Sequence, residues 1–183
     1  MYVFGYGSLI NSASRQLTGQ TGQAIPVVAH GLVRCWGKID DSYVLSPLVV
    51  NIGQGKVNGV LLEIDEFALA EFDHRERGYE RISISANQIE TEHAFNPQLP
   101  IWVYVKDSPQ PPCVHSPIVQ TYVDTVLAGC LEFSESFAHH FVEHTLGWQH
   151  PLENDRHDPK YGNLAGVQPS HHSIIDDLIA KVR

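Results

Sequence analysis

A short loop near the N-terminus contains residue types that suit the binding of an anion. Residues 5–8 read Gly-Tyr-Gly-Ser and follow Val3 and Phe4, which have the character of a short buried strand. Glycine adopts backbone conformations closed to other residues and lets a ligand approach the main chain closely. Successive N–H groups in such a loop can converge on an oxyanion or a carboxylate. The same glycines also suit a tight turn without a ligand, so the loop alone leaves both interpretations open.

A second stretch, residues 72–81, concentrates ionisable side chains where a predicted helix gives way to a predicted strand. Seven of these ten residues are Asp, Glu, His or Arg. Glu76 stands just before Gly78 and Tyr79, so its carboxylate can point inward while its neighbours stay in water. Partial burial there would suit Glu76 to act as a general base near neutral pH. The alternative is a solvated helix end whose charges pair with one another and contribute little.

Histidines in a later predicted helix offer a rival chemistry. His140 and His144 are four residues apart and share one helix face, which is the spacing of a two-histidine metal site. The glutamate that serves as general base in such sites is missing, because Phe141 follows His140. We therefore expect a packed or solvated histidine face and no metal site, and a metal-dependent hydrolase ranks third among the functions considered.

Hydrophobic patterning predicts the elements that must position these groups. Strands are predicted over 25–36 (in two parts joined near His30), 43–52, 57–64, 79–89 and 99–105, with a hairpin connection over 53–56. Helices are predicted over 66–73, 117–132, 135–146 and 174–182, and a loop with a short helix over 11–24. Because strands precede helices, we expect an α+β fold with a largely antiparallel sheet or barrel. The length suits a single domain over 1–183, with an irregular C-terminal extension from about 147.

Composition narrows the classes of partner. The net charge is −9 with only 12 basic residues, which argues against nucleic acid and against an anionic membrane surface. No apolar run approaches the roughly 20 residues that a membrane-spanning helix needs. The N-terminus has no basic region or cleavage site of a signal peptide. The 3 cysteines are far apart and suit reduced thiols, so we expect a cytoplasmic protein.

The sequence resembles the gamma-glutamylcyclotransferase superfamily, with the GGCT-like or ChaC-like branch expected, at five places in the family's order. The matching segments are 4–9 (Phe-Gly-Tyr-Gly-Ser-Leu), 31–36, 73–81, 118–122 and 148–161. The third segment resembles the one that carries the family's catalytic glutamate, here Glu76. The fourth resembles the helix whose tyrosine, here Tyr122, faces the substrate.

The resemblance implies a mixed, mostly antiparallel β-barrel flanked by helices, and a cyclisation as the reaction. The α-amine of a γ-glutamyl compound attacks its own γ-carbonyl, which releases an amine or a peptide and leaves 5-oxoproline. Glu76 would be the general base, and the loop of Tyr6, Gly7, Ser8 and Leu9 would hold the substrate's α-carboxylate or the oxyanion of the intermediate. Tyr122 would orient the substrate. We expect no cofactor and no metal, and a small γ-glutamyl compound as the partner.

Several points stay open. Glutathione-specific members continue the signature loop with an aromatic residue and a proline, whereas residues 10–15 here read Ile-Asn-Ser-Ala-Ser-Arg. γ-Glutamyl amino acids and γ-glutamylamines therefore stand beside glutathione as candidate substrates. A non-catalytic relative that binds a small carboxylate is the alternative function.

Two further groups of residues allow more than one interpretation. Arg34 could face a carboxylate, although an arginine extending over Trp36 is favoured. Residues 154–156 could line the pocket or hold the irregular tail through an Asp–Arg pair.

Overall fold

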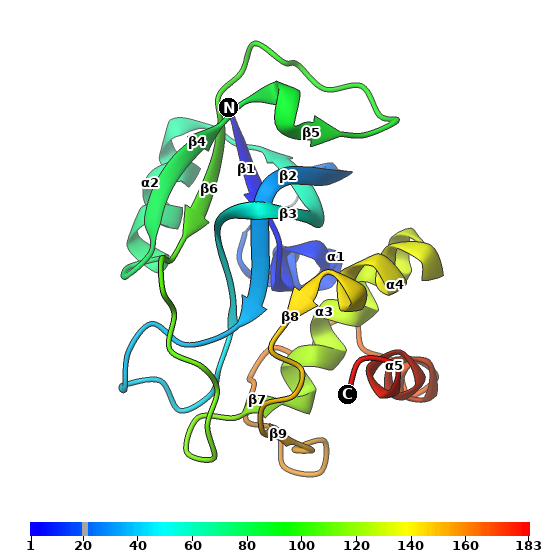
Figure 1. Ribbon diagram of the computed structural model, residues 1–183. Helices are drawn as coiled ribbons and strands as arrows, with labels where there is room; N and C mark the ends of the chain where they lie inside the picture. The colour runs from blue at the N-terminus through cyan, green and yellow to red at the C-terminus, as the bar shows by residue number, and fades with distance from the viewer. Residues whose placement is uncertain (20–21) are drawn as a thin grey trace.

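A curled mixed sheet forms the centre of the computed structural model, which describes residues 1–19 and 22–183 (Figure 1). Its strand order is β4-β6-β1-β3-β2-β5, and β8 also pairs with β2. Most neighbours are antiparallel, whereas β1 with β6 and β2 with β8 are parallel. The strands are β1 (Tyr2–Gly5), β2 (Ala24–Trp36), β3 (Leu48–Glu63), β4 (Glu80–Ile84), β5 (Ile89–Glu90), β6 (Ile101–Val105) and β8 (Thr145–Leu146). The α+β, mostly antiparallel architecture that the sequence predicted is confirmed.

The two longest strands differ from the sequence prediction. β2 is one continuous strand with an irregularity between His30 and Leu32, not two joined runs. The predicted strand residues 43–47 lie in a loop. Residues 48–52 and the strand predicted over 57–64 belong to the single strand β3, so the hairpin predicted over 53–56 is wrong. This segment instead forms a bulge, because His30 pairs with Lys56 whereas Leu32 pairs with Ile52. A Cβ at Gly55 would lie 2.4 Å from the Leu32 carbonyl oxygen, so glycine here permits close strand contact and does not mark a turn.

The helices follow the prediction with shifted ends. They are α1 (Ser12–Leu17), α2 (Glu66–Arg75), α3 (Gln120–Phe133), α4 (Glu135–Glu143) and α5 (His171–Ala180), with two 3-10 turns, η1 (Ser8–Ile10) and η2 (Ala86–Gln88). The predicted start of α3 contains the strand β7 (Ile118–Val119), and the predicted end of α4 contains the strand β8. The strand predicted over 79–89 is interrupted by η2. The short helix predicted within 11–24 is α1, and residues 20–21 of that stretch lie outside the described residues.

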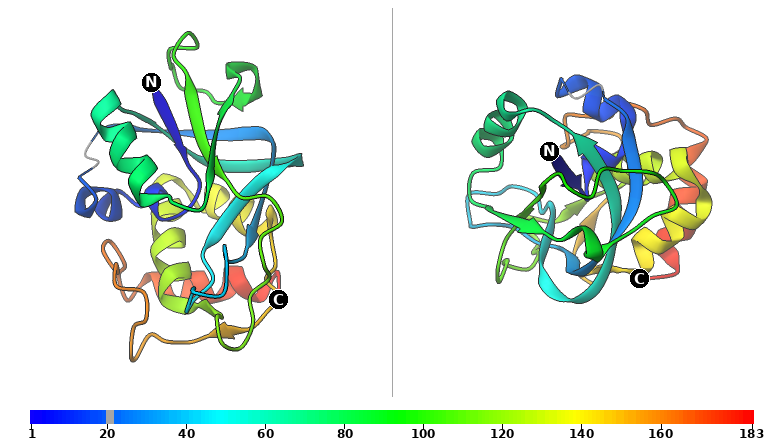
Figure 2. Two further views of the ribbon diagram at one scale, coloured as in Figure 1. Left: turned by 90° about the vertical axis from the view of Figure 1, so that its left-hand side faces the viewer. Right: turned by 90° about the horizontal axis from the view of Figure 1, so that it is seen from above.

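Apolar packing places the helices around the sheet. The α2 side chain Phe72 is buried with Val3, Val60 and Tyr104 of the sheet. The helices α3, α4 and α5 share a larger core with Trp36 and Leu48. Figure 1 shows α2 beside β4 and β6, with α3, α4 and α5 gathered at the other end of the sheet, and Figure 2 repeats this division from two more directions. The start of the chain, β1 and the loop after it, passes between these two groups of helices.

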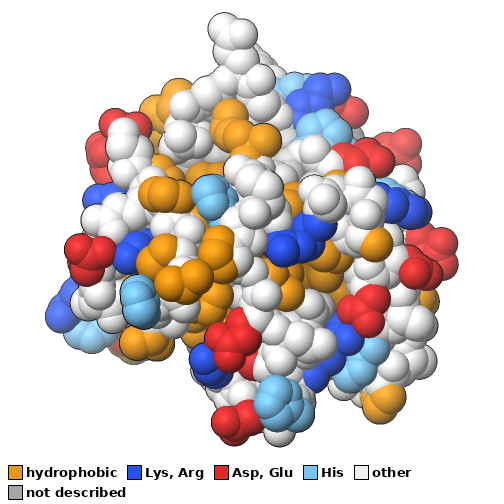
Figure 3. All heavy atoms as spheres, turned by 60° about the horizontal axis from the view of Figure 1, so that its bottom comes forward, with side chains coloured by type: hydrophobic (Ala, Val, Ile, Leu, Met, Phe, Trp, Pro, Cys, Tyr) orange, Lys and Arg blue, Asp and Glu red, His pale blue; other side chains and the backbone are white. Residues whose placement is uncertain are grey.

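Residues 147–170 form an irregular strap whose only regular element is β9 (Leu152–Glu153), which pairs with β7. On the face drawn in Figure 3, acidic, basic and histidine side chains are interspersed rather than gathered by sign. Among the described helices, none has the length and apolar character that crossing a membrane requires.

Candidate active site

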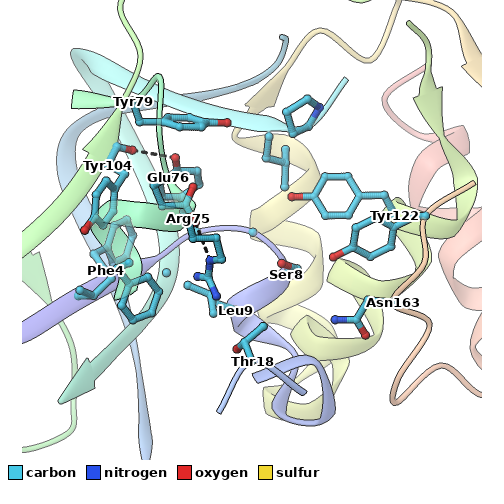
Figure 4. A pocket seen from close by; sticks show the side chains of 18 residues that line it. Phe4, Ser8, Leu9, Thr18, Arg75, Glu76, Tyr79, Tyr104, Tyr122 and Asn163 are labelled. Atoms are coloured by element: carbon cyan, nitrogen blue, oxygen red, sulfur yellow. Dashed lines mark hydrogen bonds and ion pairs between the residues drawn. The ribbon is translucent and has the colours of Figure 1, made fainter. Parts of the chain in front are cut away.

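A cavity of about 260 Å³ brings together the three parts of the site that the sequence predicted separately. Its lining includes the loop from Gly5 to Leu9, Glu76 from the end of α2, and Tyr122 from α3. Figure 4 shows Glu76, Arg75 and Tyr79 on one side, Tyr122 and Asn163 on the other, and Ser8 and Leu9 between them. All five residues predicted around the base, Tyr6, Gly7, Ser8, Leu9 and Tyr122, therefore lie with Glu76 at one cavity.

The loop between β1 and α1 is held from behind by side chains and by its own backbone. Ile10 N donates to the Gly7 carbonyl (2.9 Å), which closes the turn η1. The buried Arg15 donates through Nη1 to the carbonyls of Leu9 (2.7 Å) and Ile10 (2.8 Å). Because these hydrogen bonds fix the carbonyl oxygens of the loop, the loop keeps a defined shape where it lines the cavity.

Glu76 stands at the C-terminal end of α2, where the chain turns toward β4. Its N–H donates to the Phe72 carbonyl (2.8 Å), and its own carbonyl accepts from Tyr79 N (3.1 Å). Gly78 has a φ of 95°, a conformation that side chains disfavour, and this residue ends the helix. The Glu76 side chain is 27% exposed and accepts a hydrogen bond from Arg75 Nε (3.1 Å). Within residues 72–81, the Glu76 carboxylate therefore lines the cavity, whereas the neighbouring charged side chains are more exposed.

Tyr122 forms the opposite wall and approaches the loop closely. Its hydroxyl oxygen is 3.0 Å from the position that a Cβ on Gly7 would take. Its ring packs edge-on against Trp36 (centroids 5.8 Å apart) and at a tilt against Tyr161 (4.6 Å). Burial raises the pKa of Tyr122 well above its ordinary value, so its hydroxyl is protonated and can donate a hydrogen bond at neutral pH.

Four further tyrosines line the same cavity: Tyr6, Tyr79, Tyr104 and Tyr161. Burial raises the pKa of each phenol, so none is charged at neutral pH. Two of these hydroxyls are already engaged. Tyr6 Oη donates to the Tyr104 carbonyl (2.7 Å), and Tyr104 Oη donates to Asp73 Oδ1 (2.7 Å). The cavity therefore combines one carboxylate and one guanidinium with neutral phenols.

The sequence interpretation missed Arg75, Tyr79, Tyr104 and Asn163 as lining residues. Arg75 and Tyr79 flank the turn at Glu76 and could have been found from that adjacency. On β6, the side chain of Tyr104 points to the face opposite that of the core residues Val103 and Val105, so strand periodicity could have predicted its orientation. Asn163 lies in the irregular strap, where no local pattern indicates which way a side chain points.

Arg34 has a structural position that the sequence did not predict. It is fully buried and neither faces the cavity nor extends over Trp36. It donates to Thr145 Oγ1 (2.7 Å), to the backbone and side chain of Asn58 (2.7 and 2.9 Å), and to the carbonyls of Tyr6 (3.3 Å) and Phe141 (3.1 Å). Burial lowers the pKa of Arg34 to about 9. Five acceptors thus hold this cation between the loop, β3, α4 and β8.

Of the two alternatives for residues 154–156, the structure supports the one in which they hold the strap: they do not line the cavity, and Asp155 and Arg156 hold the strap without pairing with each other. Asp155 is buried and accepts from Thr121 N (2.8 Å) and Lys160 N (2.8 Å). Arg156 instead binds the buried Asp124 (2.8 Å) and Asp176 of α5 (2.8 Å). These contacts fix the segment that carries Tyr161 and Asn163 to the cavity.

The histidine pair predicted as a possible metal site lies away from the cavity. The rings of His140 and His144 stack in parallel with centroids 4.0 Å apart. Within residues 1–19 and 22–183, no three His, Cys, Asp or Glu side chains are grouped so that they could hold a metal ion.

The fold and the cavity define an α+β protein with a tyrosine-rich cavity beside the curled sheet. The sequence model of the family described as gamma-glutamyl cyclotransferase, AIG2-like, matches residues 3–121. The chain therefore belongs to this family. No curated protein sequence matches the chain significantly.

Solved structures show the same fold at low sequence identity. A structure titled gamma-glutamyl cyclotransferase has a TM-score of 0.58 and 14% identity, with 96% of this chain and 98% of that chain covered. An uncharacterized human protein has a TM-score of 0.57 and 15% identity, with 96% and 97% covered. YkqA from Bacillus subtilis has a TM-score of 0.61 and 19% identity, with 84% of this chain and 56% of that chain covered.

Proposed function

We propose that this protein is a γ-glutamyl cyclotransferase in which Glu76 is the general base. The observation that carries the proposal is that Glu76 lines the same cavity as the Gly5–Leu9 loop and Tyr122. A carboxylate that is partly enclosed beside a glycine-bearing loop can accept a proton at the point where an anion is stabilised. This combination suits an acyl transfer in which an amine attacks a carbonyl.

In the proposed reaction, the α-ammonium of the substrate first loses a proton to the Glu76 carboxylate. The free amine then attacks the γ-carbonyl carbon, a C–N bond forms, and the carbonyl oxygen becomes an oxyanion. Collapse of the intermediate breaks the original amide C–N bond, and the leaving nitrogen takes a proton from Glu76. The Glu76 carboxylate then accepts the second proton of the attacking nitrogen, which leaves a neutral lactam, and passes this proton to the released amine. The products are 5-oxoproline and the released amine, and Glu76 returns to its starting state.

The other cavity groups support the charge changes of this reaction. The loop amides between Tyr6 and Leu9 would hold the α-carboxylate or the oxyanion. The neutral Tyr122 hydroxyl would orient the substrate by a hydrogen bond. The reaction requires no metal or cofactor, because nucleophile and electrophile belong to one molecule and ring closure has a large proximity advantage.

The alternative is a non-catalytic protein that binds a small carboxylate in the same cavity. The presence of Glu76 disfavours it, since a protein that only binds an anion has no need of a proton acceptor in the same cavity. A base that accepts a proton from an ammonium group gives this position a physical purpose, and we therefore favour the enzyme.

Replacement of Glu76 by glutamine tests the proposal. Removal of a general base lowers rates by about 10²- to 10⁴-fold, so Glu76→Gln should lose nearly all turnover of a panel of γ-glutamyl amino acids, γ-glutamylamines and glutathione. The measurement is 5-oxoproline formation. Glu80→Gln is the matched control, since Glu80 is exposed on β4 and does not line the cavity. Absence of turnover across the panel, or full activity of Glu76→Gln, would reject the assignment.

A further inference from the structure

Arg75 is a charged group of the cavity to which the proposed mechanism gives no role. Among the described residues that line the cavity, it is the one Lys or Arg side chain. A cation at a small-molecule site that otherwise contains neutral phenols and one carboxylate would attract an anionic part of the ligand.

The Arg75 guanidinium is held in place but has unused donors. Its Nε donates to Glu76 Oε1 (3.1 Å), and its guanidinium carbon lies 4.5 Å from the centre of the Phe72 ring. Within the described part of the chain, its terminal nitrogens Nη1 and Nη2 donate no hydrogen bond. Two adjacent N–H donors in a fixed plane match the two oxygens of a carboxylate.

The guanidinium lies at the open side of the cavity. The Arg75 side chain is 38% exposed, against 27% for Glu76, whereas Tyr122 of the opposite wall is buried. Figure 4 shows Arg75 pointing from α2 toward Leu9 and Thr18, and Thr18 is exposed. In the proposed reaction the γ-glutamyl part must lie against Glu76 and the loop, whereas the leaving amine must depart toward solvent. Arg75 therefore stands on the path of the leaving group.

We propose that Arg75 selects substrates whose leaving amine carries a carboxylate, and that it binds this carboxylate through Nη1 and Nη2. The inference rests on the proposed cyclotransferase function and specifies its substrate class as γ-glutamyl amino acids rather than γ-glutamylamines. In a γ-glutamyl amino acid this carboxylate is two bonds from the leaving nitrogen. Because Glu76 returns a proton to that nitrogen, the adjacent Arg75 is within reach of the carboxylate.

Two substrates that differ only in this group test the proposal. γ-Glutamyl-alanine and γ-glutamyl-ethylamide share the γ-glutamyl part and an N-ethyl skeleton in the leaving group, but only the first has a carboxylate on that skeleton. We expect the protein to prefer γ-glutamyl-alanine by about 10- to 100-fold in kcat/KM, since hydrogen bonds to charged groups have this magnitude. Arg75→Gln should bring the kcat/KM values of the two substrates to within about threefold of each other, because only γ-glutamyl-alanine uses the Arg75 contact to its leaving group. Arg75→Lys should recover only part of the preference, because an ammonium does not bind a carboxylate through two parallel bonds.

The ethylamide also serves as an internal control for Glu76, which Arg75 contacts. If Arg75→Gln lowered kcat/KM for both substrates by the same factor, the inference would be overturned, since this result would indicate that Arg75 positions Glu76 or binds the α-carboxylate. Equal kcat/KM values of the unmodified protein for the two substrates would also overturn the inference. Arg77→Gln is the matched control variant, because Arg77 is exposed, pairs with His74 and does not line the cavity.

A binding measurement separates failure of this inference from failure of the proposed function. N-Glutaryl-alanine and N-glutaryl-ethylamine lack the α-amine and cannot cyclise, so calorimetric titration reports their affinity without turnover. Tighter binding of N-glutaryl-alanine that is lost in Arg75→Gln would support carboxylate recognition even if no γ-glutamyl compound is converted. Equal binding of the two compounds would overturn the inference whether or not the protein is a cyclotransferase.

Discussion

Gly7 is a residue at which the loop approaches the opposite wall of the cavity closely. A Cβ at this position would lie 3.0 Å from the Tyr122 hydroxyl oxygen and 3.6 Å from Leu48 Cδ1. The hydroxyl that would orient the substrate thus touches the loop that would hold its anionic group. A glycine permits this approach because it has no side chain.

We predict that Gly7→Val impairs turnover by about 10- to 100-fold, because the added atoms displace the Tyr122 hydroxyl or the loop, and overpacking of this kind costs about 1–3 kcal/mol. The measurement is kcat/KM for the best γ-glutamyl substrate, with the urea midpoint recorded to separate unfolding from loss of the site. Gly162→Ala is the control, since a Cβ there would meet nothing within 4 Å. A fully active Gly7→Val would argue against close substrate approach at this loop.

At the scale of elements, the strap of residues 147–170 completes the cavity. It carries Tyr161 and Asn163, which line the side opposite Glu76. The strap has little secondary structure of its own, so side chains must fix it. Asp155 does so at the start of α3, where it accepts hydrogen bonds from Thr121 and from Lys160 N.

We predict that Asp155→Ala lowers the free energy of unfolding by about 2–3 kcal/mol, because it leaves buried donors without an acceptor. Turnover should fall further than the loss of folded protein explains, since the strap would no longer hold Tyr161. Urea titration and 5-oxoproline assays check the two parts. Glu153→Ala removes an exposed ion pair to the same Lys160 and should change stability by less than about 1 kcal/mol. Equal stability of the two variants would show that Asp155 does not fix the strap.

At the scale of the whole molecule, the lowered pKa of His140 should make folding sensitive to acid. His140 is half-buried on α4, where burial first, then His144, Arg34 and Lys56, lower its pKa to about 4, opposed by Glu143. The unfolded chain binds a proton at this histidine near pH 6.5, whereas the folded chain does not until about pH 4. The unfolded state therefore binds more protons in this interval, and stability falls as the pH decreases from about 6.5 to about 4.

We predict that His140→Phe removes this part of the acid sensitivity while keeping a ring against His144. The difference in unfolding free energy between pH 7.5 and pH 5 should shrink by on the order of 1 kcal/mol, a value reduced for the partial exposure of the ring. Urea titrations at the two pH values measure it. His93→Asn, at an exposed position, should leave the pH dependence unchanged. An unchanged dependence in His140→Phe would contradict the assignment.

Local patterns were sufficient to predict most elements and the three parts of the site. The α2 helix begins after Asp65, whose side chain accepts from Ala68 N as the N-cap, and ends before Gly78, as these two residues indicated. Local patterns failed where long-range pairing decides the conformation. Gly53 and Gly55 are typical of a turn, but β3 pairs with β2 on both sides of them, so these residues form a bulge. The same holds for Arg34, whose acceptors come from four separate segments.

The sequence by itself determined the class of fold, the family and the identity of Glu76, the loop and Tyr122 as candidates, because each depends on residue types at short spacing. Only the tertiary structure decided that these groups share one cavity, since residues 7, 76 and 122 meet through sheet pairing and helix packing. It also decided which neighbours join them. Arg75, Tyr104 and Asn163 come from a helix end, a strand and a strap, and their convergence has no signature in any single stretch of the chain. The opening loop is thus a wall of a site whose other walls lie far along the chain.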